Sequence, residues 1–141
     1  MSALTSSQAQ GLIAAAFAAA RTKGYKPMGV VVVDAAGQIK AAAREDGATA
    51  LRIDIANGKA SAALGMGVNS RVLAQRAKDL PAFLTGLAAV SSQKFLPQTG
   101  AVLIQDASGE VIGAAGASGG TGDEDEEICI TGIAAVGLKH A

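Results

Sequence analysis

The sequence has few aromatic side chains and almost none of the residues that usually build reactive or metal centres. Its 141 residues include no tryptophan, one tyrosine, three phenylalanines, one histidine and one cysteine. The shortage of rings removes the stacking surfaces that single-stranded nucleic acids need. The one histidine, His140, is the penultimate residue, so we expect neither a histidine-based triad nor a multi-histidine metal centre within one chain. Any catalysis must use carboxylates, amines, hydroxyls or a cofactor.

The chain also lacks an excess of charge of either sign. Twelve lysines and arginines balance twelve aspartates and glutamates, so no global field attracts nucleic acid or an anionic membrane. The apolar run 12–20 is too short to span a bilayer. No basic residue precedes this run, and Arg21 and Lys23 follow it, which is the reverse of a secretion signal. We expect a cytoplasmic protein with neither nucleic-acid nor membrane partners. Cys129 has no partner for an internal disulfide and is interpreted as a small packing residue.

Small residues are what the chain has in quantity. Half of the residues are apolar and 18 are glycine, so the excess lies in alanine and glycine rather than in large side chains. This composition favours a thin sheet covered by helices that approach it closely. It also favours subunit association, because small residues leave flat surfaces.

Local patterns predict an α+β domain over residues 1–141. Thr5 and Gln8 form a capping box before an amphipathic helix that Gly24 ends. Two similar turns, 34–37 and 106–109, each begin with aspartate and end with glycine, which predicts two antiparallel hairpins. The hairpin strands are predicted at 28–33, 38–44, 100–105 and 110–117, with helices at 48–64, 70–80 and 123–139, a further turn or short helix at 81–87, and a short fifth strand at 91–95. The order is therefore α-β-β-α-α-β-β-β-α.

A glycine-rich bend near the C-terminal end carries the strongest backbone requirements in the chain. Ser118, Gly119, Gly120 and Thr121 follow an apolar strand and precede the acidic run 123–127. One interpretation is a tight turn, with Thr121 or Asp123 as the helix cap. The other is a turn that also cradles an anionic group through backbone N–H groups and the two hydroxyls.

Charged residues elsewhere are candidates for chemistry. Arg44 and Asp46 lie where a strand leaves the sheet, facing either a pocket or solvent. Asp54 and Lys59 are five residues apart on the polar side of a helix, so they pair poorly and an ordinary exposed face is expected. A buried Glu124 or Glu127 would be a candidate general acid or base, whereas an exposed one would be a cap.

Four ordered blocks resemble the GlcG/HbpS family, which includes the C-terminal domain of PduO. They are 44–48 (REDGA), 54–60 (DIANGKA), 109–120 (GEVIGAAGASGG) and, after the acidic segment, 132–135 (GIAA). The resemblance implies a five-stranded antiparallel sheet with helices packed on it, a homo-oligomer that is often an octamer, and haem or a corrinoid-related ligand. Where family members bind haem through an axial histidine, this chain has no internal histidine to offer, so the iron would need another ligand such as Tyr25, Met28, Met66 or Thr121.

Two functions remain open at this point, besides an assembly subunit with no ligand of its own. In the first, an oligomeric protein binds haem or a related tetrapyrrole, the 118–122 loop takes a propionate and Arg44 adds charge. In the second, a catabolic-pathway hydrolase, deaminase or isomerase acts on a small unsaturated carboxylic acid. The same loop then holds the substrate carboxylate, and Asp46, Asp54 or Glu124 handles protons.

Overall fold

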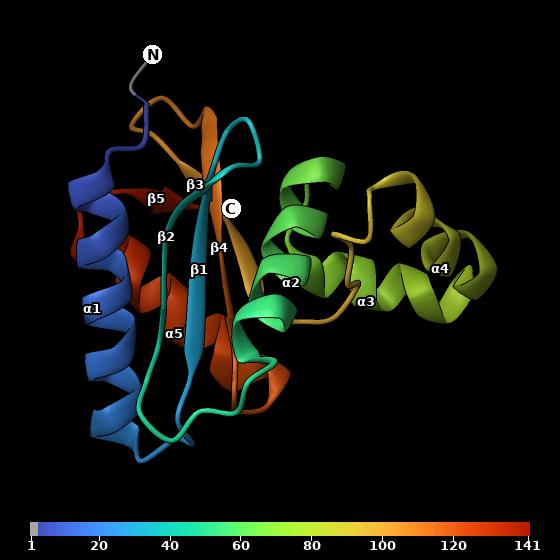
Figure 1. The fold of residues 1–141 in the computed structure, drawn as a ribbon. Helices are drawn as coiled ribbons and strands as arrows, with labels where there is room; N and C mark the ends of the chain where they lie inside the picture. The colour runs from blue at the N-terminus through green and yellow to red at the C-terminus, as the bar shows by residue number, and fades with distance from the viewer. Residues whose placement is uncertain (1–2) are drawn as a thin grey trace.

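The computed structural model describes residues 3–141 and shows one sheet with helices on both faces (Figure 1). Helix α1 (Ser6–Lys23) begins as the sequence predicts: Gln8 donates its amide to the Thr5 hydroxyl, and the Thr5 amide donates to the Gln8 side chain. Gly24 ends the helix in the left-handed conformation, with φ +68°. No helix in the described range is both long and apolar enough to cross a membrane.

The sheet has five antiparallel strands in the order β2-β1-β4-β3-β5. The strands are β1 (Gly29–Asp34), β2 (Ile39–Arg44), β3 (Ala101–Gln105), β4 (Val111–Ser118) and β5 (Lys139–His140). Both hairpin predictions are confirmed. In each turn the aspartate Oδ1 accepts two backbone amides, and the closing glycine takes a positive φ of +79° or +88°.

The predicted position of the fifth strand is wrong. Residues 91–95 form a turn in which Ser92 and Gln93 have φ of +58° and +68°, a conformation that ends helix α4 and cannot continue a strand. The fifth strand is instead β5, which pairs with the end of β3. It exists because α5 (Gly122–Ala135) ends before the predicted residue 139, and Gly137, with φ +77°, turns the chain back.

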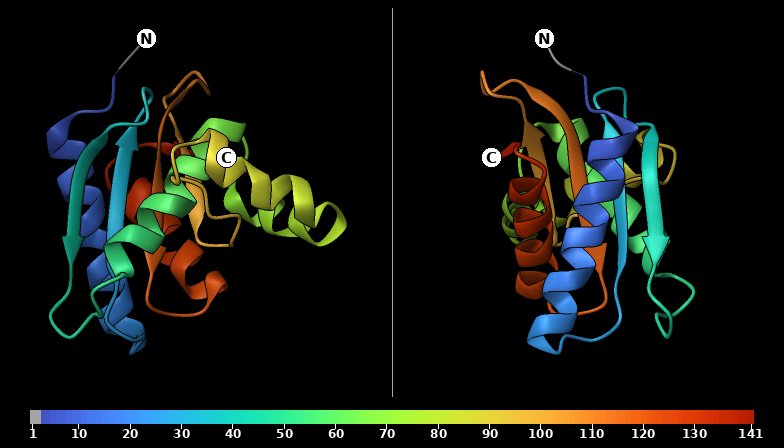
Figure 2. Two further views of the ribbon diagram at one scale, coloured as in Figure 1. Left: turned by 45° about the vertical axis from the view of Figure 1, so that its right-hand side comes forward. Right: turned by 90° about the vertical axis from the view of Figure 1, so that its left-hand side faces the viewer.

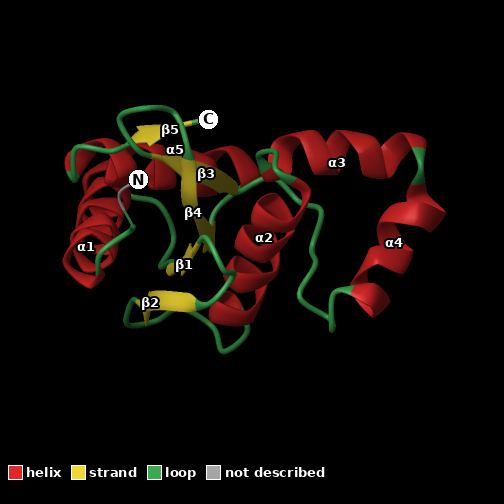
Figure 3. Cartoon of the chain, turned by 90° about the horizontal axis from the view of Figure 1, so that it is seen from above, coloured by secondary structure: helices red, strands yellow, loops and turns green. Residues whose placement is uncertain are grey.

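Helices cover the two faces of the sheet unequally (Figures 2 and 3). Helices α1 and α5 pack together on one face, and α2 (Arg52–Met66) covers the other. Helices α3 (Ser70–Asp79) and α4 (Pro81–Val90) extend sideways beyond α2. Because β1 lies between these layers, its valines are buried on both sides: Val30 and Val32 face α1 and α5, and Val31 and Val33 face α2.

Small residues set the distance between α2 and the sheet, as the composition predicts. A Cβ on Gly116 of β4 would collide with the Ala56 carbonyl and contact Ala60. A Cβ on Gly29 of β1 would lie 2.9 Å from Cβ of Arg52. Helix α2 therefore rests on the backbone of β1 and β4, and the polar residues on its inner side are brought to the ends of those strands.

Candidate ligand-binding site

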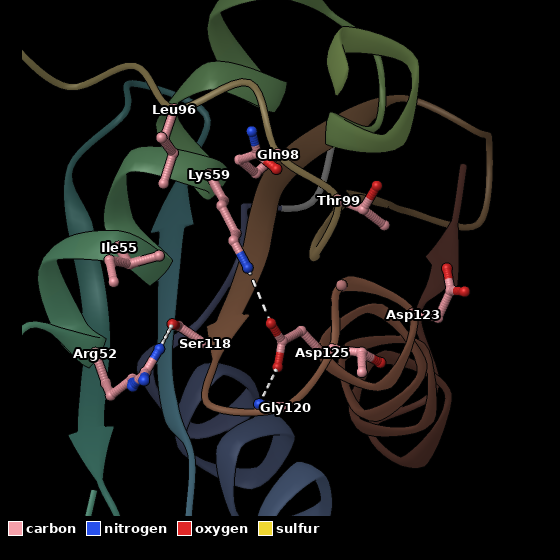
Figure 4. A pocket seen from close by; sticks show the side chains of 12 residues that line it. Arg52, Ile55, Lys59, Leu96, Gln98, Thr99, Ser118, Gly120, Asp123 and Asp125 are labelled. Carbon is pink, nitrogen blue, oxygen red and sulfur yellow. Dashed lines mark hydrogen bonds and ion pairs between the residues drawn. The ribbon is translucent and has the colours of Figure 1, made fainter. Parts of the chain in front are cut away.

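A cavity of about 470 Å³ lies between α2, the segment that precedes β3, and the loop from β4 to α5 (Figure 4). We call it the α2–α5 cavity. Its volume falls in the range usual for small-molecule sites. The lining residues are Arg52, Ile55, Lys59, Leu96, Gln98, Thr99, Ser118, Gly120, Thr121, Gly122, Asp123 and Asp125.

Arg52 supplies an unbalanced positive charge to this cavity. Its Nη1 donates to Oγ of the buried Ser118 at 3.1 Å, and its Nε donates to Oγ1 of Thr49 at 3.0 Å. These bonds use two of the five guanidinium N–H donors. No carboxylate lies within 4.0 Å of this guanidinium in the described part of the chain. The remaining donors can therefore bind an anionic ligand.

A buried ion pair builds the wall opposite Arg52. Lys59 Nζ lies 2.9 Å from Oδ2 of Asp125 and also donates to the Ala117 carbonyl at 3.1 Å. The other oxygen of Asp125 accepts the Gly120 amide at 2.9 Å. Burial raises the pKa of Asp125, against the opposing effects of Lys59, the Gly120 amide and the more distant charge of Arg52. These bonds connect α2, β4, the loop and α5, so we interpret the pair as the clamp that shapes the cavity (Figure 4).

The glycine-rich loop is mostly explained as a helix cap. Thr121 is the N-cap of α5: its Oγ1 accepts the Glu124 amide, and Oε1 of Glu124 accepts the Thr121 amide. With Gly120 bonded to Asp125, the amides of residues 120 and 121 are satisfied internally. Of the glycines at 116, 119, 120 and 122, only Gly119 has a positive φ, +152°.

The loop nevertheless borders the cavity. Ser118, Gly120 and Thr121, which the sequence predicts as ligand-binding, are among its lining residues. Within residues 3–141, the first amides of α5, those of Gly122 and Asp123, make no hydrogen bond. Asp123, at the rim of the cavity, points its exposed carboxylate to Arg71, which also pairs with Glu126. The helix N-terminus adds to the positive character of the site.

Arg44 and Asp46 lie elsewhere. They line a second cavity of about 440 Å³ together with Arg21, Pro27 and Glu45, which we call the Arg44 cavity. Arg44 is exposed and donates to the Ala48 carbonyl at 3.2 Å. The structure therefore does not bring Arg44 to the 118–122 loop within one chain.

The three predicted catalytic carboxylates are not brought together. Asp46 lines the Arg44 cavity, Asp54 is exposed on α2, and Glu124 completes the capping box of α5. Glu124 also lines a third cavity, of about 370 Å³, with Gly119, Tyr25 and Lys26.

Glu127 is not a free acid or base. It accepts the Tyr25 hydroxyl at 3.0 Å and pairs with Lys23 at 2.6 Å, and the hydrogen bond from Lys23 lowers the pKa of Glu127. The pKa of the Tyr25 hydroxyl is raised, chiefly by desolvation and then by its hydrogen bond to Glu127.

The sequence analysis missed Arg52, Lys59 and Asp125 as site residues. The expectation that Lys59 is exposed is wrong, since its residual exposure is 5%. A signal was present: positions 52, 56, 59 and 63 follow one helical stripe, so two cations share the buried face of α2 with alanines. Likewise Asp125 lies three and four residues before the buried Ile128 and Cys129.

The expected alternative iron ligands are engaged or remote. Met28 is fully buried on the α1 side of the sheet, and Met66 packs in the cluster under α3 and α4. The Tyr25 hydroxyl is bonded to Glu127, and the Thr121 hydroxyl caps α5. Among the described residues, no three histidine, cysteine or acidic side chains gather as a metal site.

The chain is an antiparallel α+β protein in which Arg52 and the N-terminus of α5 face one polar cavity. Residues 4–134 match the HbpS-like family, described as haem degrading protein HbpS-like, and the chain belongs to this family. No curated protein matches the sequence significantly.

Solved structures support the same assignment. A double mutant of HbpS from Streptomyces reticuli is 29% identical, with coverage of 97% of this chain and 89% of that one and a TM-score of 0.84. A PduOC:heme complex is 28% identical, covers 97% of both chains and has a TM-score of 0.85. Protein ORFY of Klebsiella pneumoniae is 26% identical, with coverage of 94% and 90% and a TM-score of 0.83.

Proposed function

We propose that this chain binds haem or a related tetrapyrrole, with the ligand's carboxylates in the α2–α5 cavity. The observation that carries the proposal is the Arg52 guanidinium, which faces the cavity without a carboxylate partner in residues 3–141. The family match and the likeness to a protein solved as a heme complex give the ligand class.

The residues present fit one part of such a ligand well. Arg52, the Ser118 hydroxyl and the amides that open α5 suit a propionate, because charged N–H donors and helix N-termini favour carboxylates. Ile55 and Leu96 offer apolar contact for a ring edge. We assign this chain ligand binding rather than hydrolase, deaminase or isomerase chemistry, because Asp46, Asp54 and Glu124 share no site and the comparisons give that chemistry no support.

Self-association and a cytoplasmic location remain parts of the proposal. The α3–α4 extension carries exposed apolar side chains, with Leu80 57%, Phe83 58% and Val90 79% exposed. Apolar groups exposed together favour protein contacts, and a second copy of the chain is the expected partner.

Hemin titration tests the proposal. The Soret band should sharpen and saturate at a fixed ratio to protein, and Ile55→Asp should weaken binding about tenfold, because its carboxylate repels a propionate in the cavity. Ala14→Asp places the same charge on the exposed side of α1 and should leave affinity unchanged. A featureless wild-type titration would refute the function, and equal weakening by both variants would refute the location.

A further inference from the structure

The groups that line the α2–α5 cavity can bind the carboxylates of a tetrapyrrole but offer no ligand for its metal. Haem iron is held in proteins by histidine, cysteine, methionine or tyrosine side chains. The α2–α5 cavity is lined by none of these. By contrast, Arg52 and the N-terminus of α5 are suited to carboxylates.

The only histidine lies away from the cavity. His140 is on β5, where it pairs with Ile104 near the far end of β3. The cavity instead borders Gln98 and Thr99, which precede the start of β3 at Ala101. Several residues of extended strand therefore separate the imidazole from the site.

Two buried side chains near the cavity, Cys129 and Lys59, are also not available as metal ligands. Cys129 is fully buried, its Sγ directed at the Gly100 carbonyl, and burial raises the pKa of this thiol. Lys59 does line the cavity, but its ammonium is bonded to Asp125 and to the Ala117 carbonyl. A protonated amine has no lone pair for a metal.

We infer that this chain recognises the tetrapyrrole through its carboxylates alone, so that the metal-free porphyrin binds as tightly as the iron form. The inference rests on the proposed function and specifies its selectivity. Arg52, Ser118 and the α5 N-terminus carry the recognition, and the metal contributes no bond to this chain.

Parallel titrations of the full chain with hemin and metal-free protoporphyrin IX test this inference. Hemin is followed by absorbance and the porphyrin by fluorescence. The two dissociation constants should agree within about threefold. Arg52→Ala should raise both by a similar factor of about 10 to 100, the usual size for a lost charged hydrogen bond.

His140→Ala provides the matching control and should leave hemin affinity unchanged. Hemin binding more than tenfold tighter than protoporphyrin IX, or a loss of hemin binding in His140→Ala, would overturn the inference while leaving the proposed function intact. Failure of both compounds to bind wild-type protein would overturn both.

Discussion

The α2–α5 cavity and the Arg44 cavity lie at neighbouring places on the sheet and are built differently. Each contains one arginine that hydrogen-bonds only to uncharged groups and one ion pair. Arg52 reaches Ser118 and Thr49, whereas Arg44 is exposed and bonds the Ala48 carbonyl. The pair in the first cavity, Lys59–Asp125, is buried, whereas Arg21 in the second is 48% exposed in its pair with Glu45.

The position of Gly29 on β1 explains why Arg52 reaches the 118–122 loop and Arg44 does not. It pairs with Arg44 on β2 and with Ser118 on β4, so both residues lie on the α2 side of the sheet. Helix α2 places Arg52 directly over Gly29, between them. Arg52 therefore takes the position beside the loop that the sequence analysis gave to Arg44. Packing, rather than nearness to a recognisable motif, determines which cation reaches the site.

The largest expected effect comes from breaking the buried pair. Asp125→Ala should lower the free energy of unfolding by about 3–5 kcal/mol, because it leaves the Lys59 ammonium buried without a counter-ion. Arg21→Ala, which breaks the more exposed pair and removes hydrogen bonds to the Tyr25 and Lys26 carbonyls, should cost only about 1–2 kcal/mol. Denaturant unfolding measures both. Equal losses would show that the two cavities are not built differently.

Filling the space at Gly29 should have an intermediate effect. Gly29→Ala places a methyl group 2.9 Å from Cβ of Arg52 and should cost about 1–3 kcal/mol and weaken hemin binding, because Arg52 must move. Gly65 lies on helix α2, as Arg52 does, and a Cβ there would meet nothing within 4 Å, so Gly65→Ala should be neutral or stabilising by up to about 1 kcal/mol. If the Gly29→Ala protein keeps the stability and the hemin affinity of the wild type, the assignment of Arg52 to the binding site is contradicted.

Local sequence rules predicted most of the fold because the signals lie within a few residues. The Thr5–Gln8 box and the two aspartate-to-glycine turns appear as expected, and of the two caps considered for the last helix the structure has Thr121. The fifth strand was misplaced because β5 has two residues and depends on pairing with β3, about 35 residues away along the chain.

The site was predicted only in part for a related reason. The loop was found through its glycines and hydroxyls, which are local. The contacts of Arg52, Lys59 and Asp125 join α2, β4 and α5. A stripe of buried positions in the sequence indicates that these side chains face inward, but it does not identify the groups that they contact. The partner of a buried charge is a property of tertiary packing.

The smallest expected effect is a shift in the pKa of Tyr25, because the neighbouring ion pair of Lys23 and Glu127 is partly exposed. As the only tyrosine, Tyr25 can be titrated by its ultraviolet absorbance, and its pKa in the folded protein should lie above the ordinary 10.0. Glu127→Gln should bring that pKa closer to 10.0. Because the folded pKa is raised, stability should fall as pH rises from the unfolded towards the folded value. An unshifted wild-type titration would contradict this arrangement.

Hemin affinity of Arg52→Ala set against that of Arg44→Ala tests the central claim most directly. The two variants remove the same charged group from the same face of the sheet, one from each cavity. We predict a loss of about 10- to 100-fold for Arg52→Ala and less than about twofold for Arg44→Ala. The reverse order, or equal losses, would contradict the assignment of the α2–α5 cavity as the binding site.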